Sequence, residues 1–313
     1  MLLKPIKNAA AYRVVLPAAA LLEDHLATRP FTEPRPTDQS ALGFVPTPTV
    51  SEGELVTTFI GGYAFSVRYD DKVIPGGVVL AEIAKACEAY TERTGLKPSR
   101  KYRTEIKESV IAELRARALI RTKIITCFYH PELEILVVPV SSQNLADQIT
   151  KLLIQAVESI ESRTIHISEL AQGLTTRLAG KVSGADDTFA PFEISSSVWL
   201  VGPSGEKVTY QMGDTLDGAN DGLQELLAAG FFVDAVRLHY QDVEFKLTRQ
   251  FKFRSICFPA PAEVQDTETQ GDLWRHEASV QLLSFVTVVK TLCDLFGYKA
   301  PAAEEQTVED PMS

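Results

Sequence analysis

The spacing of apolar and polar residues predicts a mixture of strands and helices over the first 94 residues. Residues 10–16 are typical of a strand, and residues 18–28 of a short helix. A proline-rich passage follows and is expected to be rich in turns through Gly43-Phe44-Val45-Pro46. Strands at 57–59 and 63–69 alternate around Gly61-Gly62 as a hairpin would. A helical pattern then runs from Val78 to Thr94 and is closed by Gly95.

The next elements are predicted to be a helix over 99–120, strands over 122–129 and 133–140, and a helix capped by Asn144. Residues 1–165 therefore indicate an N-terminal α+β lobe, which includes a helical excursion at 95–125. This order of elements predicts antiparallel rather than parallel sheets in an α+β fold.

Residues 166–298 differ in composition from the first lobe and are assigned to a second α+β lobe. Its first part, 183–234, holds nine acidic residues and one basic residue, Lys207. A short helix at 223–229, strand-like runs at 231–240, 243–247 and 250–258, and a long helix at 273–296 follow. The remaining segment, 299–313, is acidic and is expected to be disordered.

Composition places the chain among ordinary folded proteins, with 45% hydrophobic and 23% charged residues in 313. The formal net charge of −10 counts against a partner as acidic as DNA. The charge is segregated, however. Residues 95–125 contain nine Lys/Arg and three acidic residues, a net +6 that leaves −16 for the rest of the chain.

The basic residues of this excursion are candidates for polyanion contact. On a helix, Arg100, Arg103 and Lys107 would share a face, and Arg117 and Arg121 would form an i, i+4 pair. The candidate DNA-binding residues here are Arg100, Lys101, Arg103, Lys107, Arg115, Arg117, Arg121 and Lys123. The alternative is a solvated helix face with ion pairs to neighbouring glutamates.

A second basic stripe lies at 243–254. If this segment is extended, Lys246, Lys252 and Arg254 lie on one face, and the aromatic residues of the segment lie on the other. These three cations are further candidates for DNA contact. The stripe also fits the solvent-facing side of an ordinary sheet.

No catalytic or metal-binding motif emerges. Four cysteines are scattered without metal-ligand spacing, which favours reduced thiols in a cytoplasmic protein. Asp214, Asp217 and Asp221 do not match a calcium loop. The sequence predicts no metal and no cofactor, and the apolar run 278–289 is too short to span a membrane.

Six blocks in order resemble the RdgC family of bacterial recombination-associated proteins. They are Lys7-Asn8-Ala9-Ala10-Ala11-Tyr12-Arg13-Val14, Phe31-Thr32 with Gly43-Phe44-Val45-Pro46, Asp71-Lys72-Val73-Ile74-Pro75, the stretch from Lys107-Glu108-Ser109-Val110-Ile111 to Arg117-Ala118-Leu119-Ile120-Arg121, the strands of 230–258, and the last helix up to Gly297. The resemblance runs from residue 1 to about 298.

The resemblance implies a ring-like homodimer whose basic central hole takes double-stranded DNA with little sequence preference. It implies antagonism of RecA-promoted strand exchange and a nucleoid-associated location, without catalysis, although an older label for the family is exonuclease. The chain departs from the family in three places. Leu119 stands where the family often has an aromatic residue, which the resemblance places at the dimer interface. A basic run near Tyr210 is missing, and the acidic tail is extra.

Three hypotheses remain open at this point. The favoured one is a non-enzymatic DNA-binding protein that modulates recombination. The second is a metal-dependent DNA exonuclease whose carboxylates are not adjacent in sequence. The third is a protein-interaction module whose basic helix docks an acidic partner. One such partner is the acidic segment 183–234 of a second copy of this chain, whose net charge is −8.

Overall fold

The computed structural model describes residues 3–48, 50, 53–158, 162–165, 167, 169–185, 188–211, 221–259 and 269–298. The acidic tail expected to be disordered lies outside the described residues, as do Asp214 and Asp217. The chain divides into unit 1, Met1–Arg163 with Pro261–Leu282, and unit 2, Thr164–Ala260 with Leu283–Ser313. The last helix is therefore shared between the units, whereas the sequence analysis assigned all of it to the second lobe.

Unit 1 is built on a sheet of seven strands in the order β2-β4-β5-β6-β1-β7, with β3 paired to β4. The strands are β1 (Ala10–Val14), β2 (Ser40–Val45), β3 (Val56–Phe59), β4 (Gly62–Val73), β5 (Leu119–His130), β6 (Ile135–Val138) and β7 (Ser162–Thr164). The predicted hairpin around Gly61-Gly62 is confirmed, because β3 and β4 pair antiparallel from Val56↔Phe65 to Phe59↔Gly62.

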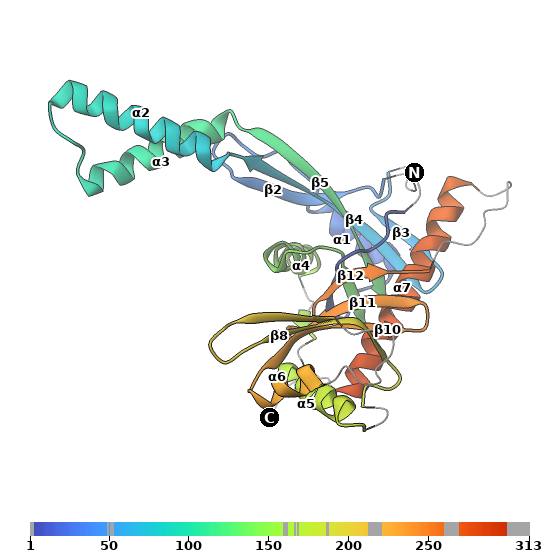
Figure 1. Ribbon diagram of the computed structural model, residues 1–313. Coiled ribbons are helices and arrows are strands. Elements are labelled where there is room, and N and C mark those ends of the chain that lie inside the picture. Colours follow the sequence, from blue (N-terminus) through green and yellow to red (C-terminus); the bar gives the residue numbers. More distant parts are fainter. Residues whose placement is uncertain are drawn as a thin grey trace, which may run out of the picture. The chain divides into compact units, whose positions relative to one another are not determined.

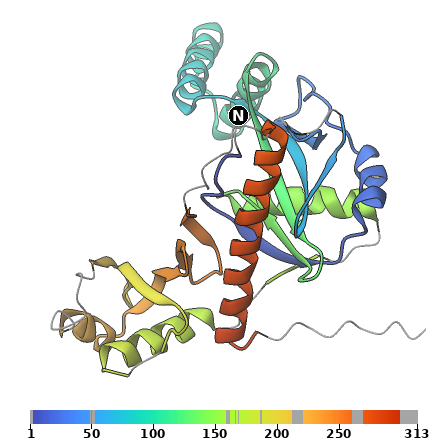
Figure 2. The same cartoon turned by 90° about the vertical axis from the view of Figure 1, so that its right-hand side faces the viewer.

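The helices of unit 1 are α1 (Ala19–Ala27), α2 (Gly76–Thr94), α3 (Arg100–Ala116) and α4 (Gln143–Val157), together with the first half of α7 (Gln270–Leu295). Residues of α1 and α4 are fully buried against one face of the sheet. Trp274 of α7 stacks on Phe128, and α7 lies on the opposite face (Figure 2). The predicted cap of α4 was wrong: Ser142, not Asn144, accepts the backbone N–H of Leu145.

Strand β2 occupies a passage in which the sequence analysis expected turns. It pairs with β4 from Ser40↔Asp71 to Val45↔Ser66. Gly43 is required here because a Cβ on it would lie only 2.3 Å from the Cα of Phe31. The Phe31 segment packs directly on β2, with Pro30 and Phe44 forming a parallel bridge. This close approach explains why the Phe31 and Gly43-Phe44 blocks occur together in the sequence.

Unit 2 is a five-stranded antiparallel sheet in the order β12-β11-β10-β8-β9. Its elements are α5 (Leu170–Val182), β8 (Glu193–Val201), β9 (Lys207–Gln211), α6 (Asp221–Ala228), β10 (Phe232–Tyr240), β11 (Val243–Thr248), β12 (Phe253–Cys257) and the second half of α7. The three predicted strands between 231 and 258 are confirmed, whereas α5, β8 and β9 were not predicted. Figure 1 shows α5 and α6 against one face of this sheet.

Helix α7 is long and apolar enough, by length and composition, to cross a membrane, and it is alone in this among the described residues. Its apolar side chains pack inside the two units: the first half of the helix in unit 1 and the second half in unit 2. Trp274 packs on Phe59 and Phe128 in unit 1. Phe285 packs edge-on against Phe253 in unit 2, with ring centroids 4.8 Å apart. The burial of both halves is that of a core helix.

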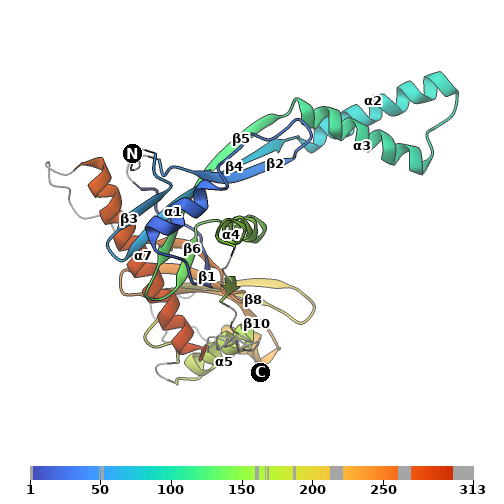
Figure 3. The same ribbon diagram turned by 180° about the vertical axis from the view of Figure 1, so that it is seen from behind.

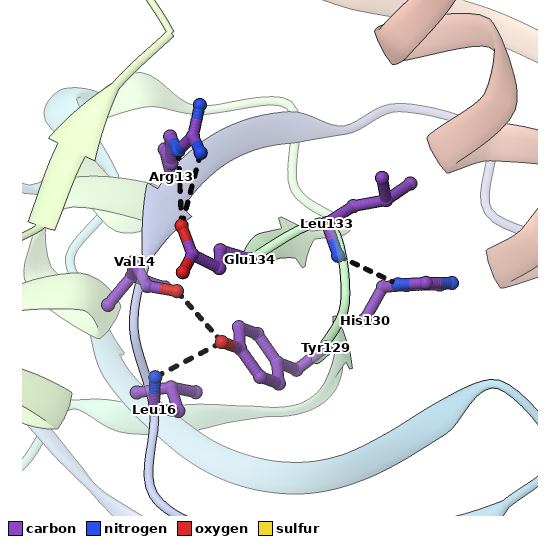
Figure 4. Close-up of polar contacts among 7 residues, drawn as sticks. All are labelled: Arg13, Val14, Leu16, Tyr129, His130, Leu133 and Glu134. Carbon is purple, nitrogen blue, oxygen red and sulfur yellow. Dashed lines mark hydrogen bonds and ion pairs between the residues drawn. The ribbon is translucent and has the colours of Figure 1, made fainter. Parts of the chain in front are cut away.

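The connection between β1 and α1 is held by the side chain of Tyr129 on β5 (Figure 4). The buried Tyr129 hydroxyl donates to the carbonyl oxygen of Val14 at 2.9 Å and accepts the N–H of Leu16 at 3.1 Å. Beside it, Arg13 on β1 forms an ion pair with Glu134 at 3.2 Å. One tyrosine hydroxyl therefore satisfies two buried backbone groups where the chain leaves the sheet.

Replacing Tyr129 with Phe leaves the Val14 carbonyl and the Leu16 N–H without their partner. Because each unsatisfied buried polar group is costly, we expect a loss of about 2 kcal/mol in the free energy of unfolding, measured by urea titration. Tyr102→Phe in α3 is the matched control and should change stability by less than about 0.5 kcal/mol, because its hydroxyl has no hydrogen bond to the described residues. Equal stability of the two variants would contradict this role for Tyr129.

Candidate nucleic-acid interface

Strands β4 and β5 extend beyond the core of unit 1 and carry an antiparallel pair of helices, α2 and α3 (Figures 1 and 3). We call residues 95–125 the basic arm, as this range holds the predicted basic excursion. The turn between the helices begins at Gly95, whose φ of 72° suits glycine, and ends at Ser99, whose hydroxyl caps α3. Tyr90 and Tyr102 pack between the helices with ring centroids 4.4 Å apart. Neither helix has a fully buried residue.

The root of the arm is held by Lys72, a buried residue of β4. Its ammonium group donates to the carbonyl oxygens of Arg35 at 2.5 Å and of Pro36 at 2.8 Å. This contact ties β4 to the loop that precedes β2. The Asp71-Lys72-Val73 block is thus explained as a structural anchor for the arm.

Four candidate cations lie exposed on α3: Arg100, Lys101, Arg103 and Lys107. No carboxylate of the described part of the chain lies within ion-pair distance of any of them. The i, i+3, i+7 spacing of Arg100, Arg103 and Lys107 falls within one continuous helix, so the three lie along one side of it. These side chains present uncompensated positive charge to solvent.

Arg115 and Arg117 are engaged by the protein itself. Arg115 is half-buried and donates from Nη1 to the carbonyl oxygen of Thr37 at 3.3 Å. Arg117 caps the end of α3 and forms an ion pair with Glu113 at 2.6 Å. The two residues differ in availability, because Arg117 is exposed to solvent whereas Arg115 is half-buried with its Nε atom against the protein.

The predicted helix over 99–120 was wrong at its end. Helix α3 stops at Ala116, and β5 begins at Leu119, so Arg121 and Lys123 lie on a strand and the expected helical pair of Arg117 and Arg121 does not exist. The register of β4 and β5 places Leu119 opposite Val73, Arg121 opposite Asp71 and Lys123 opposite Tyr69. The three side chains therefore share one face of the strand, and Arg121 pairs with Asp71 at 3.1 Å.

The root of the arm also exposes apolar side chains. Leu119 is 83% exposed and its neighbour Val73 is 40% exposed, while Val78 and Leu80 at the start of α2 are also exposed. Single exposed apolar residues are common on protein surfaces, but several in one short region indicate a contact surface. The arm therefore combines cations with an apolar root.

The second basic surface lies in unit 2. Residues 243–254 form a hairpin of β11 and β12 rather than one extended strand, which corrects the predicted stripe. The register places Arg237 of β10 opposite Lys246 of β11, and Lys246 opposite Arg254 of β12. We call Arg237, Lys246 and Arg254 the cation row. Lys252 lies in the turn of the hairpin and is not part of it.

Lys246 occupies an unusual position in this row. Its Nζ atom lies 3.2 Å from the centroid of the Trp199 ring, a cation–π contact. Burial lowers the pKa of the Lys246 ammonium, and the charges of Arg237 and Arg254 lower it further against the opposing effect of Asp234. Arg237 alone in the row has a carboxylate partner among the described residues, Glu244 at 3.0 Å.

Sequence reasoning missed Arg237 and Trp199. Both lie in strands with alternating burial, since Val236 and Leu238 flank Arg237 and Val198 and Leu200 flank Trp199, and these flanking residues are nearly inaccessible. That alternation is a period-two signal which would place Arg237 and Trp199 on the opposite face from the core. Their proximity to Lys246 depends on strand register, which the alternation does not reveal.

The described residues contain no group of three or more His, Cys, Asp or Glu side chains that could hold a metal ion. The cysteines form no disulfide; Cys127 is buried in the core, and burial raises the pKa of its thiol. The geometry of this part of the chain therefore offers two basic surfaces rather than a carboxylate cluster.

Comparison with known proteins gives the family of the chain. A family model described as "Putative exonuclease, RdgC" matches residues 5–299. Curated relatives named recombination-associated protein RdgC include one from Herminiimonas arsenicoxydans, 27% identical over 89% of this chain and 92% of the relative. Another, from Bordetella pertussis, is 26% identical over 92% of this chain and 96% of the relative. Because the family model covers nearly the whole chain, the chain belongs to the RdgC family of recombination-associated proteins.

Proposed function

We propose that this chain is a non-enzymatic protein that binds double-stranded DNA with little sequence preference and so modulates homologous recombination. The observation that carries the proposal is the set of exposed cations on α3, which have no carboxylate partner in the described residues. Membership of a recombination-associated family supports the biological setting.

Helix α3 is long enough to lie along several phosphates of a DNA strand. Its 17 residues span about 26 Å, and DNA presents one phosphate per about 3.4 Å along each strand. Several cations on one side of the helix are therefore able to contact a series of phosphates. Lys and Arg at helical spacing position a protein on the backbone without reading bases.

The rest of the chain restricts the orientation of binding. Outside residues 95–125 the net charge is −16, so most of the molecule repels a polyanion. DNA is attracted where the cations are concentrated. The binding should therefore be weak at high salt and restricted in orientation.

Occupation of duplex DNA by such a protein would compete with recombination enzymes for the same substrate. Antagonism of RecA-promoted strand exchange follows in this proposal from steric exclusion and needs no direct contact with RecA. A cytoplasmic, nucleoid-associated location is the corresponding expectation.

Removing three unpaired cations tests the proposal. The variant R100A/R103A/K107A should bind duplex DNA about tenfold more weakly at moderate salt, and the slope of log affinity against log salt should fall by about 2 to 3. Fluorescence anisotropy on several unrelated duplexes measures both quantities. The control K4A/K7A/K151A removes the same charge from exposed positions outside both basic surfaces and should keep the original slope.

Three results would contradict the proposal: no duplex binding at low salt, strong preference for one sequence, or equal slopes for the two variants. Binding of an acidic protein but not of DNA would favour the interaction module instead. The exonuclease alternative is separated by incubating end-labelled linear duplex with Mg²⁺ or Mn²⁺, which should leave the label at full length.

We further propose that the chain forms a homodimer, closed as a ring, with Leu119 at one interface. Leu119 projects from the arm root with 83% of its surface exposed, next to Val73 and near the exposed start of α2. An aliphatic side chain of this exposure gains most from burial against an apolar surface of a second copy.

Leu119→Glu should therefore shift the solution mass from dimer towards monomer without changing the thermal unfolding of the monomer. Ile60→Glu is the matched control, since Ile60 is an equally exposed apolar residue of unit 1 at 82%. Light scattering after size exclusion over a tenfold concentration range measures the effect. A dimer that survives Leu119→Glu as well as it survives Ile60→Glu would remove Leu119 from the interface.

A further inference from the structure

Trp199 lies beside the cation row on the outer face of the unit 2 sheet, opposite the face that packs on α5 (β8, β10 and β11 in Figure 1). Val198, Leu200, Val236 and Leu238 point to the packed face and are at most 1% exposed. Strand alternation sends Trp199 to the other face, where it is only partly buried. The outer face therefore joins an aromatic ring to three cations.

The cation row is electrostatically unfavourable by itself. Like charges directly opposite on neighbouring strands destabilise a sheet, and the register places Lys246 between Arg237 and Arg254. Among the described residues, no carboxylate lies within ion-pair distance of Lys246 or Arg254. The charge of Asp234 opposes that of the two arginines at Lys246, but Asp234 itself pairs with Arg249 at 3.0 Å. An anion placed between Lys246 and Arg254 would relieve this repulsion.

The position of Lys246 connects the anion site to the ring. Its ammonium covers the Trp199 ring at 3.2 Å, held by a cation–π contact worth about 0.5–2 kcal/mol. A lysine stem is flexible, and a phosphate offers its ammonium a charge-assisted partner. When the ammonium turns towards a phosphate, the face of Trp199 is uncovered.

An uncovered indole beside a phosphate site is the arrangement that binds an unpaired nucleotide. Bases of a duplex are stacked on one another, whereas a single strand presents a free π-face to an aromatic side chain. Polar groups are available on the same face: Ser197 and Gln211, hydrogen-bonded to each other at 3.0 Å, lie on the neighbouring strands β8 and β9.

We propose that this face is a second DNA site, separate from the basic arm, that takes an unpaired strand with a phosphate between Lys246 and Arg254 and a base on Trp199. This inference rests on the proposed function, because both require that the chain binds DNA. It adds a selectivity for single strands which the arm does not provide.

Substitutions at Trp199 test the site. Trp199→Leu should weaken binding of a labelled oligodeoxythymidylate about tenfold, because one stacked base is lost, and should leave affinity for a duplex of equal length within about twofold. Trp199→Phe keeps a ring and should retain most of the single-strand affinity. Lys246→Gln should weaken single-strand binding without removing the ring.

Intrinsic fluorescence gives an independent readout. The chain has two tryptophans, and Trp274 is buried in unit 1 at 3% exposure. Quenching by the oligonucleotide should therefore disappear in Trp199→Leu and persist in Lys246→Gln at saturating ligand. Thermal unfolding of each variant checks that the sheet is intact.

Failure of this inference is distinguishable from failure of the proposed function. Duplex binding with no single-strand binding, or with equal single-strand affinity in wild type and Trp199→Leu, overturns the inference and leaves the proposed function standing. Single-strand binding that depends on Trp199, in a chain that binds no duplex, would overturn the proposed function alone. An equal loss of both ligands in Trp199→Leu, with unchanged folding, would also overturn the inference.

Discussion

The antiparallel ladder between β4 and β5 is the interaction on which the rest of unit 1 depends. It pairs residues from Tyr63↔Tyr129 to Val73↔Leu119 without interruption. Near the core, one face of the ladder is apolar and fully buried, as at Phe65 and Cys127. Further out, the same face carries Asp71 opposite Arg121. One end of the ladder therefore belongs to the core of unit 1, and the other end supports the basic arm. A shift of the strand register by one residue would move every side chain of the shifted strand to the opposite face of the sheet.

Local patterns were enough to predict much of the fold. The helix that ends at Gly95, the hairpin at Gly61-Gly62 and the strands between 231 and 258 follow from periodicity and turn residues. The junction after α3 did not, because Arg117-Ala118-Leu119-Ile120-Arg121 is a good helix-forming sequence. Its last three residues are strand only because β4 offers backbone partners from far away in the sequence. Tertiary pairing likewise decides β2, whose turn-forming residues had indicated a loop.

The candidate site was predicted in kind but not in detail. Counting charge along the chain located the basic arm, since segregation of Lys and Arg is visible without a structure. A count of charges along the sequence does not show which cations form contacts within the protein. Arg115 binds the carbonyl of Thr37, a contact between distant segments. Arg237 and Trp199 were missed for a related reason, because their neighbours on the face are set by the register of three strands.

The cations of the basic arm differ in how readily they can contact a phosphate. The pairs of Arg117 with Glu113 and of Arg121 with Asp71 have exposed arginines, and such pairs are worth about 0–1 kcal/mol. A phosphate is able to replace these carboxylates at little cost, so both arginines remain compatible with DNA contact. Arg115 is different, because its residue is half-buried and its Nε atom lies against the protein, so contact with a phosphate would require the guanidinium to leave its packed position. The contribution of each arginine of the arm therefore depends on what it gives up, and in this respect Arg115 is part of the scaffold, whereas the exposed cations of α3 give up only water.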